Sequence, residues 1–204
     1  MKDWSLLASE ESIKKVSDSL KSENIEVFIF ENGLEAKKKV LELIPIGAEV
    51  MTMSSQTLEA IGINKEINES GSYNSVKAKL MKMDRITEGR EMQKLGAAPD
   101  WAIGSIHAVS EDGHVFVVSN TGSQLGAYAY SASHVIWVVG SQKIVKDWEE
   151  GVKRVYEYSL PHESERQKGL GNAKGSNIGK FLIFNNEIRQ GRVTMIIVKE
   201  ELGF

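Results

Sequence analysis

The feature that most constrains the fold is the stretch Trp101–Lys143, in which apolar runs alternate with glycine-bearing turns. Three strand-like runs are separated by a tight turn at Glu111-Asp112-Gly113 and by a polar loop that leads into a small-residue, helix-like segment. The last run, Val135–Val139, is apolar throughout and ends at Gly140. A continuous apolar strand usually has both faces covered, as in parallel or mixed sheets with helices on either side.

The segments before this stretch alternate between helix and strand. Amphipathic helices are expected at Ser9–Glu23, where Ser9 can cap, and at Leu34–Ile44, with Leu34 on the apolar face. Strands are expected at Ile25–Phe30 and Ala48–Met53. Strand–helix–strand order favours parallel pairing with a right-handed crossover. The pattern therefore predicts a three-layer α/β fold, with a mostly parallel or mixed sheet and helices on both faces.

The rest of the chain adds further helices and two final strands. Residues 64–95 are polar and helix-prone, and we expect a helical insertion whose methionines pack in the core or in a lid. A helix is predicted over Lys146–Tyr158, with Pro161 interrupting it. Its apolar face is expected to carry Trp148, Val152, Val155 and Tyr156. Strands are predicted over Phe181–Phe184 and Val193–Val198. We expect one domain, 1–204, because a chain of this length can bury a full core.

Composition excludes several classes of protein. The net charge of -3, with Lys and Arg scattered among acids, argues against a nucleic-acid binder. The chain has no cysteine, so it has no disulfide, thiolate metal ligand or cysteine nucleophile. No apolar run resembles a signal peptide or a membrane span, and a cytoplasmic location is expected. The four histidines match no zinc spacing, so neither a metal nor a cofactor is expected.

The turn Ser54–Thr57 is the first candidate ligand site, because it joins a strand to a short helix. The hydroxyls of Ser54, Ser55 and Thr57, with the N–H groups of the helix start, can hold a phosphate or carboxylate. The alternative is that Ser54 or Ser55 merely caps the helix.

The polar loop after the second apolar run is the stronger candidate. Loops outside the carboxyl ends of strands are where open α/β sheets bind ligands. The loop offers side-chain hydrogen-bonding groups and unhindered N–H groups from Asn120, Thr121, Gly122 and Ser123. Lys143, just beyond a strand end, is expected to supply positive charge, with a solvated surface lysine as the alternative.

An acid–base pair is a further hypothesis. His107 lies beside Gly104 and Ser105 and precedes Glu111 by four residues. If the run turns near Gly104, the imidazole and the carboxylate both approach the carboxyl end of the sheet, as general acid–base chemistry needs.

Three segments resemble one family: AIGSIHAVSEDGHVFVVSN, HVIWVVGSQKIVKDWEEGVKRVYEYSLPHESER and RVTMIIVKEELGF. Together with the run that begins at Ala48, they are similar to the lactate-utilisation (LUD) domain family over most of the chain. The resemblance implies the fold of sugar-phosphate isomerases and CoA transferases (NagB/RpiA/CoA transferase-like). It also implies lactate oxidation together with iron–sulfur partner proteins. Some relatives carry a cysteine-rich segment where this chain has 169–177, so this chain is not expected to carry the cluster itself.

Three functions follow as hypotheses. The first is a LUD-type protein of lactate or small carboxylic-acid metabolism that binds a small anion between the Ser54–Thr57 turn and the Asn120–Gln124 loop. The second is an isomerase-like or CoA-transferase-like enzyme, with a carboxylate facing the anion site. The third is a non-catalytic subunit that binds an iron–sulfur partner and exposes an apolar patch. A homodimer is expected, because dimers are the commonest oligomers of soluble proteins.

Overall fold

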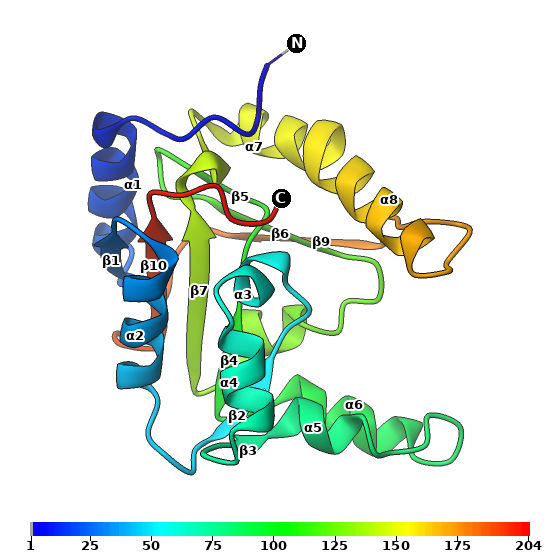
Figure 1. Cartoon of the computed structure of the whole chain (residues 1–204). Coiled ribbons are helices and arrows are strands. Elements are labelled where there is room, and N and C mark those ends of the chain that lie inside the picture. Colours follow the sequence, from blue (N-terminus) through cyan, green and yellow to red (C-terminus); the bar gives the residue numbers. More distant parts are fainter. Residues whose placement is uncertain (1) are drawn as a thin grey trace.

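The computed structural model describes residues 2–204 and contains two β-sheets, of six and four strands. The larger, sheet A, has the order β1-β10-β7-β4-β2-β3, and all its neighbouring strands are parallel. Its strands are β1 (Glu26–Phe30), β2 (Glu49–Thr52), β3 (Asn74–Ser75), β4 (Trp101–Gly104), β7 (His134–Gly140) and β10 (Val193–Val198). Because the strands run the same way, their carboxyl ends share one edge, at the top in Figure 1.

The smaller sheet, sheet B, has the order β8-β5-β6-β9. Its strands are β5 (Ala108–Ser110), β6 (Val115–Ser119), β8 (Ile144–Val145) and β9 (Lys180–Phe184). β5 and β6 form an antiparallel hairpin, with Gly113 of the predicted tight turn at φ +93°. The first apolar run of the central stretch therefore divides after Gly104, and its two halves lie in different sheets.

The three-layer α/β prediction is confirmed, and β7 and β10 form the centre of the core. Val135, Trp137 and Val139 face one cluster of buried side chains, and Ile136 and Val138 face another. All five are at most 1% exposed. This alternation explains why the strand is apolar throughout: each of its faces is covered by a separate layer.

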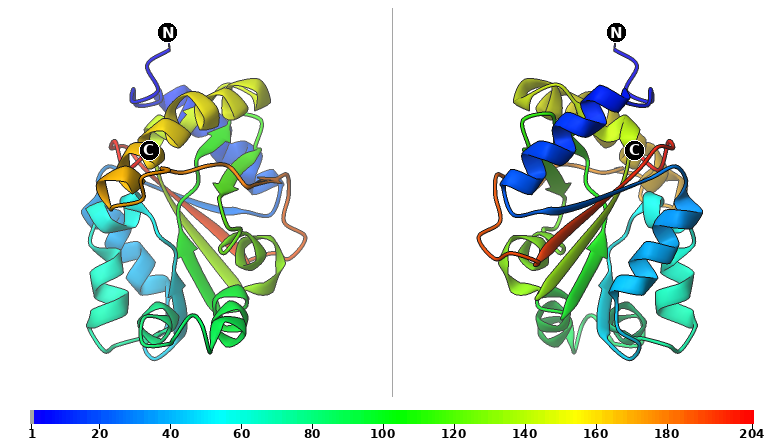
Figure 2. Two further views of the ribbon diagram at one scale, coloured as in Figure 1. Left: turned by 90° about the vertical axis from the view of Figure 1, so that its right-hand side faces the viewer. Right: turned by 90° about the vertical axis from the view of Figure 1, so that its left-hand side faces the viewer.

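One face of sheet A is covered by α2 (Gly33–Leu43), α3 (Gln56–Ala60) and α4 (Ile63–Glu69). In Figure 2 (left), α3 and α4 in cyan lie on one side of the central strands, and β5 and β6 in green lie on the other. Asn32 caps α2 by accepting a hydrogen bond from the N–H of Glu35. Leu34, expected on the apolar face of this helix, is instead 65% exposed.

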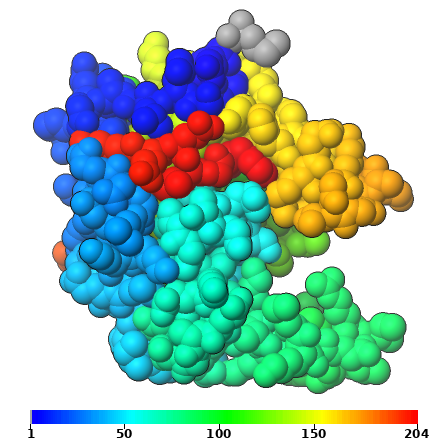
Figure 3. Space-filling model, in the orientation of Figure 1, coloured from blue at the N-terminus to red at the C-terminus, as the bar shows by residue number. Residues whose placement is uncertain are grey.

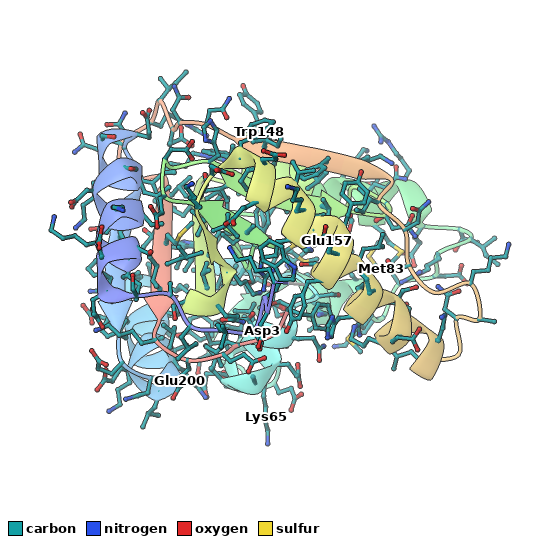
Figure 4. All side chains as sticks on the ribbon, turned by 90° about the horizontal axis from the view of Figure 1, so that it is seen from above. Asp3, Lys65, Met83, Trp148, Glu157 and Glu200 are labelled. Atoms are coloured by element: carbon teal, nitrogen blue, oxygen red, sulfur yellow. The ribbon has the colours of Figure 1, made fainter. Side chains whose placement is uncertain are left out.

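The opposite face is covered by α1 (Glu10–Ser22), the π-helical turn η1 (Ala127–Ser131) and sheet B. Ser9 caps α1 as its sequence suggests, and Ile13, Val16 and Leu20 are buried. Sheet B is covered in turn by α7 (Trp148–Arg154) and the π-helical turn η3 (Val155–Ser159), and α8 (Leu160–Gly169) continues the same helical run. Figure 4 shows Trp148 and Glu157 on this helical run, which crosses the top of the molecule.

Three predictions about these elements are wrong. Pro161 does not interrupt the helix, because it occupies the first turn of α8, where its missing N–H costs no hydrogen bond. β1 and β2 are parallel but do not pair, since β10, β7 and β4 lie between them. Trp148 and Tyr156, expected on the buried face of the helix, are 44% and 52% exposed.

The insertion at 64–95 contains α4, β3, α5 (Val76–Leu80) and most of α6 (Gly89–Ala97). α5 and α6 form an arm at the lower right of Figure 1. None of the residues of α6 is buried, and Met81 and Ile86 are 80% and 93% exposed. Met81 therefore does not pack in the core, and packing of the methionines in a lid stays a prediction. Within residues 2–204, no helix has the length and apolar character needed to span a membrane.

A buried arginine fixes η1 to the start of β10. Arg192 is 4% exposed and pairs with the carboxylate of Glu187, which is 7% exposed. Its remaining N–H groups donate to the carbonyl oxygens of Ala127, Tyr128 and Ala132 at 2.8–3.0 Å. The guanidinium thereby joins three carbonyls of the short helix and its C-terminal flank to the start of β10, and the Ala127 carbonyl also accepts the N–H of Ala132.

Replacement of Arg192 with alanine should lower the free energy of unfolding by about 3–5 kcal/mol, because it leaves a buried carboxylate and several carbonyls unpaired. Urea denaturation followed by circular dichroism measures the change. Arg189→Ala is the matched control: its exposed side chain donates to the Tyr130 carbonyl, and its loss should cost less than about 0.5 kcal/mol. Equal losses in the two variants would contradict this account.

Candidate functional site

A cavity of about 560 Å³ opens beyond the carboxyl ends of β2 and β4. Its walls are the start of α3, the loop after β6, the helical run of η3 and α8, and the loop 172–178. Figure 3 shows a notch in the outline of the molecule between α8 (orange) and the arm (green). Open parallel sheets bind ligands at this edge, because the strand ends leave room between diverging connections.

Most of the candidate residues from the sequence line this cavity, and three do not. The nine that line it are Ser54, Ser55, Thr57, Ser105, His107, Asn120, Thr121, Ser123 and Lys143. Gly104, Gly122 and Glu111 lie outside the lining. The structure therefore brings the first turn and the polar loop to one cavity, as the sequence suggests.

The turn 54–57 uses its hydroxyls mainly within the protein. Ser55 Oγ caps α3 by accepting a hydrogen bond from the N–H of Leu58, at 3.3 Å, so the capping alternative holds for this residue. Thr57 is buried, and its hydroxyl donates to the Leu202 carbonyl oxygen at 2.9 Å. Ser54 is exposed at the cavity wall. α3 has only five residues, so its dipole adds little to any anion site.

The loop after β6 is held in place by hydrogen bonds from its own ends. The N–H of Gly122 donates to Ser119 Oγ at 2.9 Å, and Gln124 Nε2 donates to the Val118 carbonyl at 3.2 Å. Gly122 has φ +87°, and a Cβ atom there would collide with the Lys180 side chain. Its role is therefore to shape the loop.

Lys143 is the central residue of the site. It lies in a 3₁₀ turn, Ser141–Lys143, directly after β7, and is 2% exposed. Its Nζ is 3.1 Å from Thr57 Oγ1, 3.1 Å from Ser105 Oγ and 3.2 Å from the Ile106 carbonyl oxygen. The alternative of a solvated lysine is therefore wrong. Burial, and secondly the charge of Arg154, hold the pKa of Lys143 well below its usual value.

Arg154 is a second buried base, which the sequence analysis missed. Its Nη1 donates to the His107 carbonyl and to Ser159 Oγ, and both of these residues line the cavity. Within residues 2–204, its Nε and Nη2 have no hydrogen-bond partner. Burial lowers the pKa of Arg154 to about 10, so it stays charged at neutral pH. The helical spacing could have indicated the burial of Arg154, because it lies on the same face of the helical run as the buried Gly151 and Val155.

His107 lies in the cavity wall as a neutral imidazole. Its Nδ1 accepts a hydrogen bond from the N–H of Val118 at 3.2 Å, which places the proton on Nε2. Burial lowers the pKa of His107 to about 3, and the charges of Lys143 and Arg154 add to this effect. The ring is therefore an N–H donor and no general base at neutral pH, since Nδ1 is already occupied.

Glu111 does not join His107, and the predicted acid–base pair is wrong. Its carboxylate accepts from Ser12 Oγ at 2.6 Å and lies 3.2 Å from Lys15 Nζ, both on α1. The reason is the change of sheet after Gly104, which places β5 and its turn beside α1. The Glu111 carboxylate therefore has a structural role, because it joins the turn after β5 to α1.

The acidic side chains of the lining do not neutralise the two buried bases. Glu163 pairs with Arg166 through two hydrogen bonds of 2.7 Å, and Glu59 accepts from Asn64. Across the described part of the chain, neither Lys143 nor Arg154 has a carboxylate within 4.0 Å. The same residues contain no group of three or more His, Asp or Glu side chains placed to hold a metal ion.

Comparison with known proteins identifies the class. The model of the LUD domain family matches residues 13–201, and the chain belongs to that family. A crystal structure of a DUF162 family protein from Deinococcus radiodurans is similar, with TM-score 0.56 and 11% identity over 95% of this chain and 99% of that one. This likeness shows the shared fold.

A second solved structure, eIF2B beta from Chaetomium thermophilum, matches 69% of this chain and 46% of that one, with TM-score 0.35 and 11% identity. This likeness is too low to carry an argument. No curated protein sequence matches the chain.

The low pKa of His107 predicts acid sensitivity. The unfolded chain binds a proton at about pH 6.5 but the folded chain only at about pH 3, so unfolding takes up a proton between these values. Stability should therefore fall as pH decreases from 6.5 to 3, with this residue contributing about 1.4 kcal/mol per pH unit. His107→Asn keeps an acceptor for Val118 and should remove that part of the slope. The free energy of unfolding is measured by urea denaturation at several pH values. If its slope against pH is the same in the unaltered protein and in His107→Asn, this role of His107 is excluded.

Gly104 should be intolerant of a side chain. A Cβ atom there would overlap the Tyr128 hydroxyl, which is buried at the cavity and has no partner within residues 2–204. Gly104→Ala should cost about 1–3 kcal/mol of stability. Tyr128→Phe should be nearly neutral alone and should recover at least half of that loss in the double variant, measured by thermal unfolding. If the stability changes of the two single variants simply add in the double variant, the Tyr128 hydroxyl is not the cause of the loss in Gly104→Ala.

Proposed function

We propose that this LUD-domain protein binds a small anionic metabolite in the cavity at the carboxyl ends of β2 and β4, as part of small carboxylic-acid metabolism. The observation that carries the proposal is the pair of buried bases, Lys143 and Arg154, without a carboxylate partner among residues 2–204. Buried charge is ordinarily paired, because removal from water is costly. An anion in the cavity supplies a partner for the charge that remains, on Arg154.

The remaining polar groups suit the same ligand. The Tyr128 hydroxyl and the exposed Asn120, Thr121 and Ser123 side chains offer hydrogen-bond donors around the cavity. The neutral His107 ring adds an N–H donor. Donors that converge on a cavity are what an anion needs, since each oxygen accepts more than one hydrogen bond.

The size of the cavity bears on which anion it holds. A volume of about 560 Å³ is in the range of small-molecule sites and holds many waters at about 30 Å³ each. Lactate or pyruvate would fill only the part beside Lys143. The volume therefore favours a larger anion, such as a phosphorylated metabolite or an acyl thioester, as in the isomerase-like or transferase-like alternative.

A partner-binding role is a second candidate, because the arm exposes Met81 and Ile86. An iron–sulfur partner is part of this candidate only through the resemblance. Serine at both positions should abolish co-purification with such a partner. Ile188→Ser, which alters another isoleucine that is 87% exposed, should leave it intact. Equal binding by all variants would remove the arm from consideration.

A thermal-shift screen tests anion binding. Lactate, pyruvate, sugar phosphates, CoA esters and folates are added to the purified protein. A ligand at about 100 times its Kd should stabilise the fold by about 2.7 kcal/mol and raise Tm by about 5–10 °C. Lys143→Met should lose most of the shift, and Lys38→Met, on the exposed surface, should keep it. The absence of a shift with every class would contradict the proposal.

A further inference from the structure

The amino group of Lys143 differs from that of a surface lysine in its partners. It touches two hydroxyl groups and one backbone carbonyl, at 3.1–3.2 Å. The Thr57 hydroxyl gives its proton to the Leu202 carbonyl, so Thr57 Oγ1 accepts an N–H from Lys143. The Ile106 carbonyl accepts a second N–H.

The third partner completes a set that suits a neutral amine. A neutral amine has two N–H groups and one lone pair, and the Ser105 hydroxyl can donate its proton to that lone pair. An ammonium ion would be satisfied by the same three oxygen atoms. The surrounding charges therefore decide between the two forms.

Those charges favour the neutral form. The charged group on the neighbouring helical run is the Arg154 guanidinium, which repels a second positive charge. On the segment after β4, the titratable neighbour is His107, which is neutral. The start of α3 and the C-terminal segment present a hydroxyl and a carbonyl. Without a carboxylate within 4.0 Å in the described chain, nothing holds the proton on Lys143.

We propose that Lys143 is a nucleophile that forms an imine with the carbonyl group of the bound anionic metabolite. This inference rests on the proposed function, and it narrows the ligand class to 2-oxo acids and phosphorylated aldehydes or ketones. A neutral amine that is buried in a cavity and adjoins another cationic group is the arrangement that activates lysine for this chemistry.

The step needs no oxidant or reductant. The Nζ lone pair attacks the carbonyl carbon to form a C–N bond, and the carbonyl oxygen takes up a proton. Loss of a proton from Nζ gives a neutral carbinolamine. Its hydroxyl group then takes up a further proton from solvent and leaves as water, while the nitrogen lone pair forms the C=N bond of the protonated imine. The Ser105 hydroxyl, 3.1 Å from Nζ, is placed to relay these protons. Arg154 supplies the positive field that attracts the anionic group of the ligand.

Lys77 provides an internal comparison, because it lines the same cavity. It is half-buried, and burial lowers its pKa, but the carboxylate of Glu59 acts in the opposite direction. The proposal therefore requires Lys143 to be modified in preference to Lys77, although both side chains reach the cavity.

Reductive trapping of the whole protein tests the proposal. The protein is incubated at neutral pH with sodium cyanoborohydride and pyruvate, glyoxylate or dihydroxyacetone phosphate, and is then analysed by intact mass and peptide mapping. We expect one adduct per chain, equal in mass to the carbonyl compound minus water plus two hydrogen atoms, located on Lys143. Lys143→Met should reduce trapping at least tenfold, and Lys38→Met should leave it unchanged. Circular dichroism and Tm establish that the variants are folded.

Two further arms separate this inference from the proposed function. Lactate has the charge of pyruvate but no ketone, so it should raise Tm without forming an adduct. Lys143→Arg retains N–H donors at this position but forms no imine, so it should lose trapping with all three carbonyl probes. If the probes raise Tm but none of the three carbonyl compounds forms an adduct on Lys143, the imine hypothesis is overturned and anion binding is left intact. Adducts on Lys77 or on surface lysines, at the same yield as on Lys143, would also overturn the imine. If the probes cause no Tm shift and form no adduct, both the imine and anion binding are overturned.

Discussion

The rest of the structure depends on the burial of β7 and β10 on both faces. Val135, Trp137 and Val139 require one covering layer, and Ile136 and Val138 require another. Helices α2, α3 and α4 supply the second layer, while α1 and sheet B supply the first. Because both central strands are parallel to their neighbours, every connection must return over one of these faces, and the carboxyl ends collect at one edge.

This arrangement explains why the candidate site contains a buried lysine. β7 is the innermost strand of the site, and the chain turns sharply at Ser141–Lys143 directly after it. A side chain on this turn has protein on all sides, so Lys143 reaches the cavity from below the surface. The long aliphatic stem makes this burial tolerable, and the amino group finds three oxygen partners at its end.

Two basic side chains in one poorly solvated region, Lys143 and Arg154, also set the chemical character of the cavity. Arg154 keeps its charge and depresses the pKa values of its neighbours His107 and Lys143, on which burial has the larger effect. The result is a neutral imidazole, a weakly basic amine and a fixed cation within one network of contacts. Such a set favours binding of an anion and disfavours general base catalysis by histidine.

The sequence by itself determined most of the helices and strands and the three-layer class, because these rest on local patterns. The apolar run Val135–Val139, the cap at Ser9 and the turn at Gly113 each follow from neighbouring residues. The sequence also identified nine residues of the cavity, since the polar turns follow apolar strands. It did not identify Arg154, the separation of Glu111 from His107 or the exposure of the methionine-containing arm. Those facts depend on sheet B, and only the tertiary structure decides them, because the pairing of β5, β6, β8 and β9 joins segments distant in the chain.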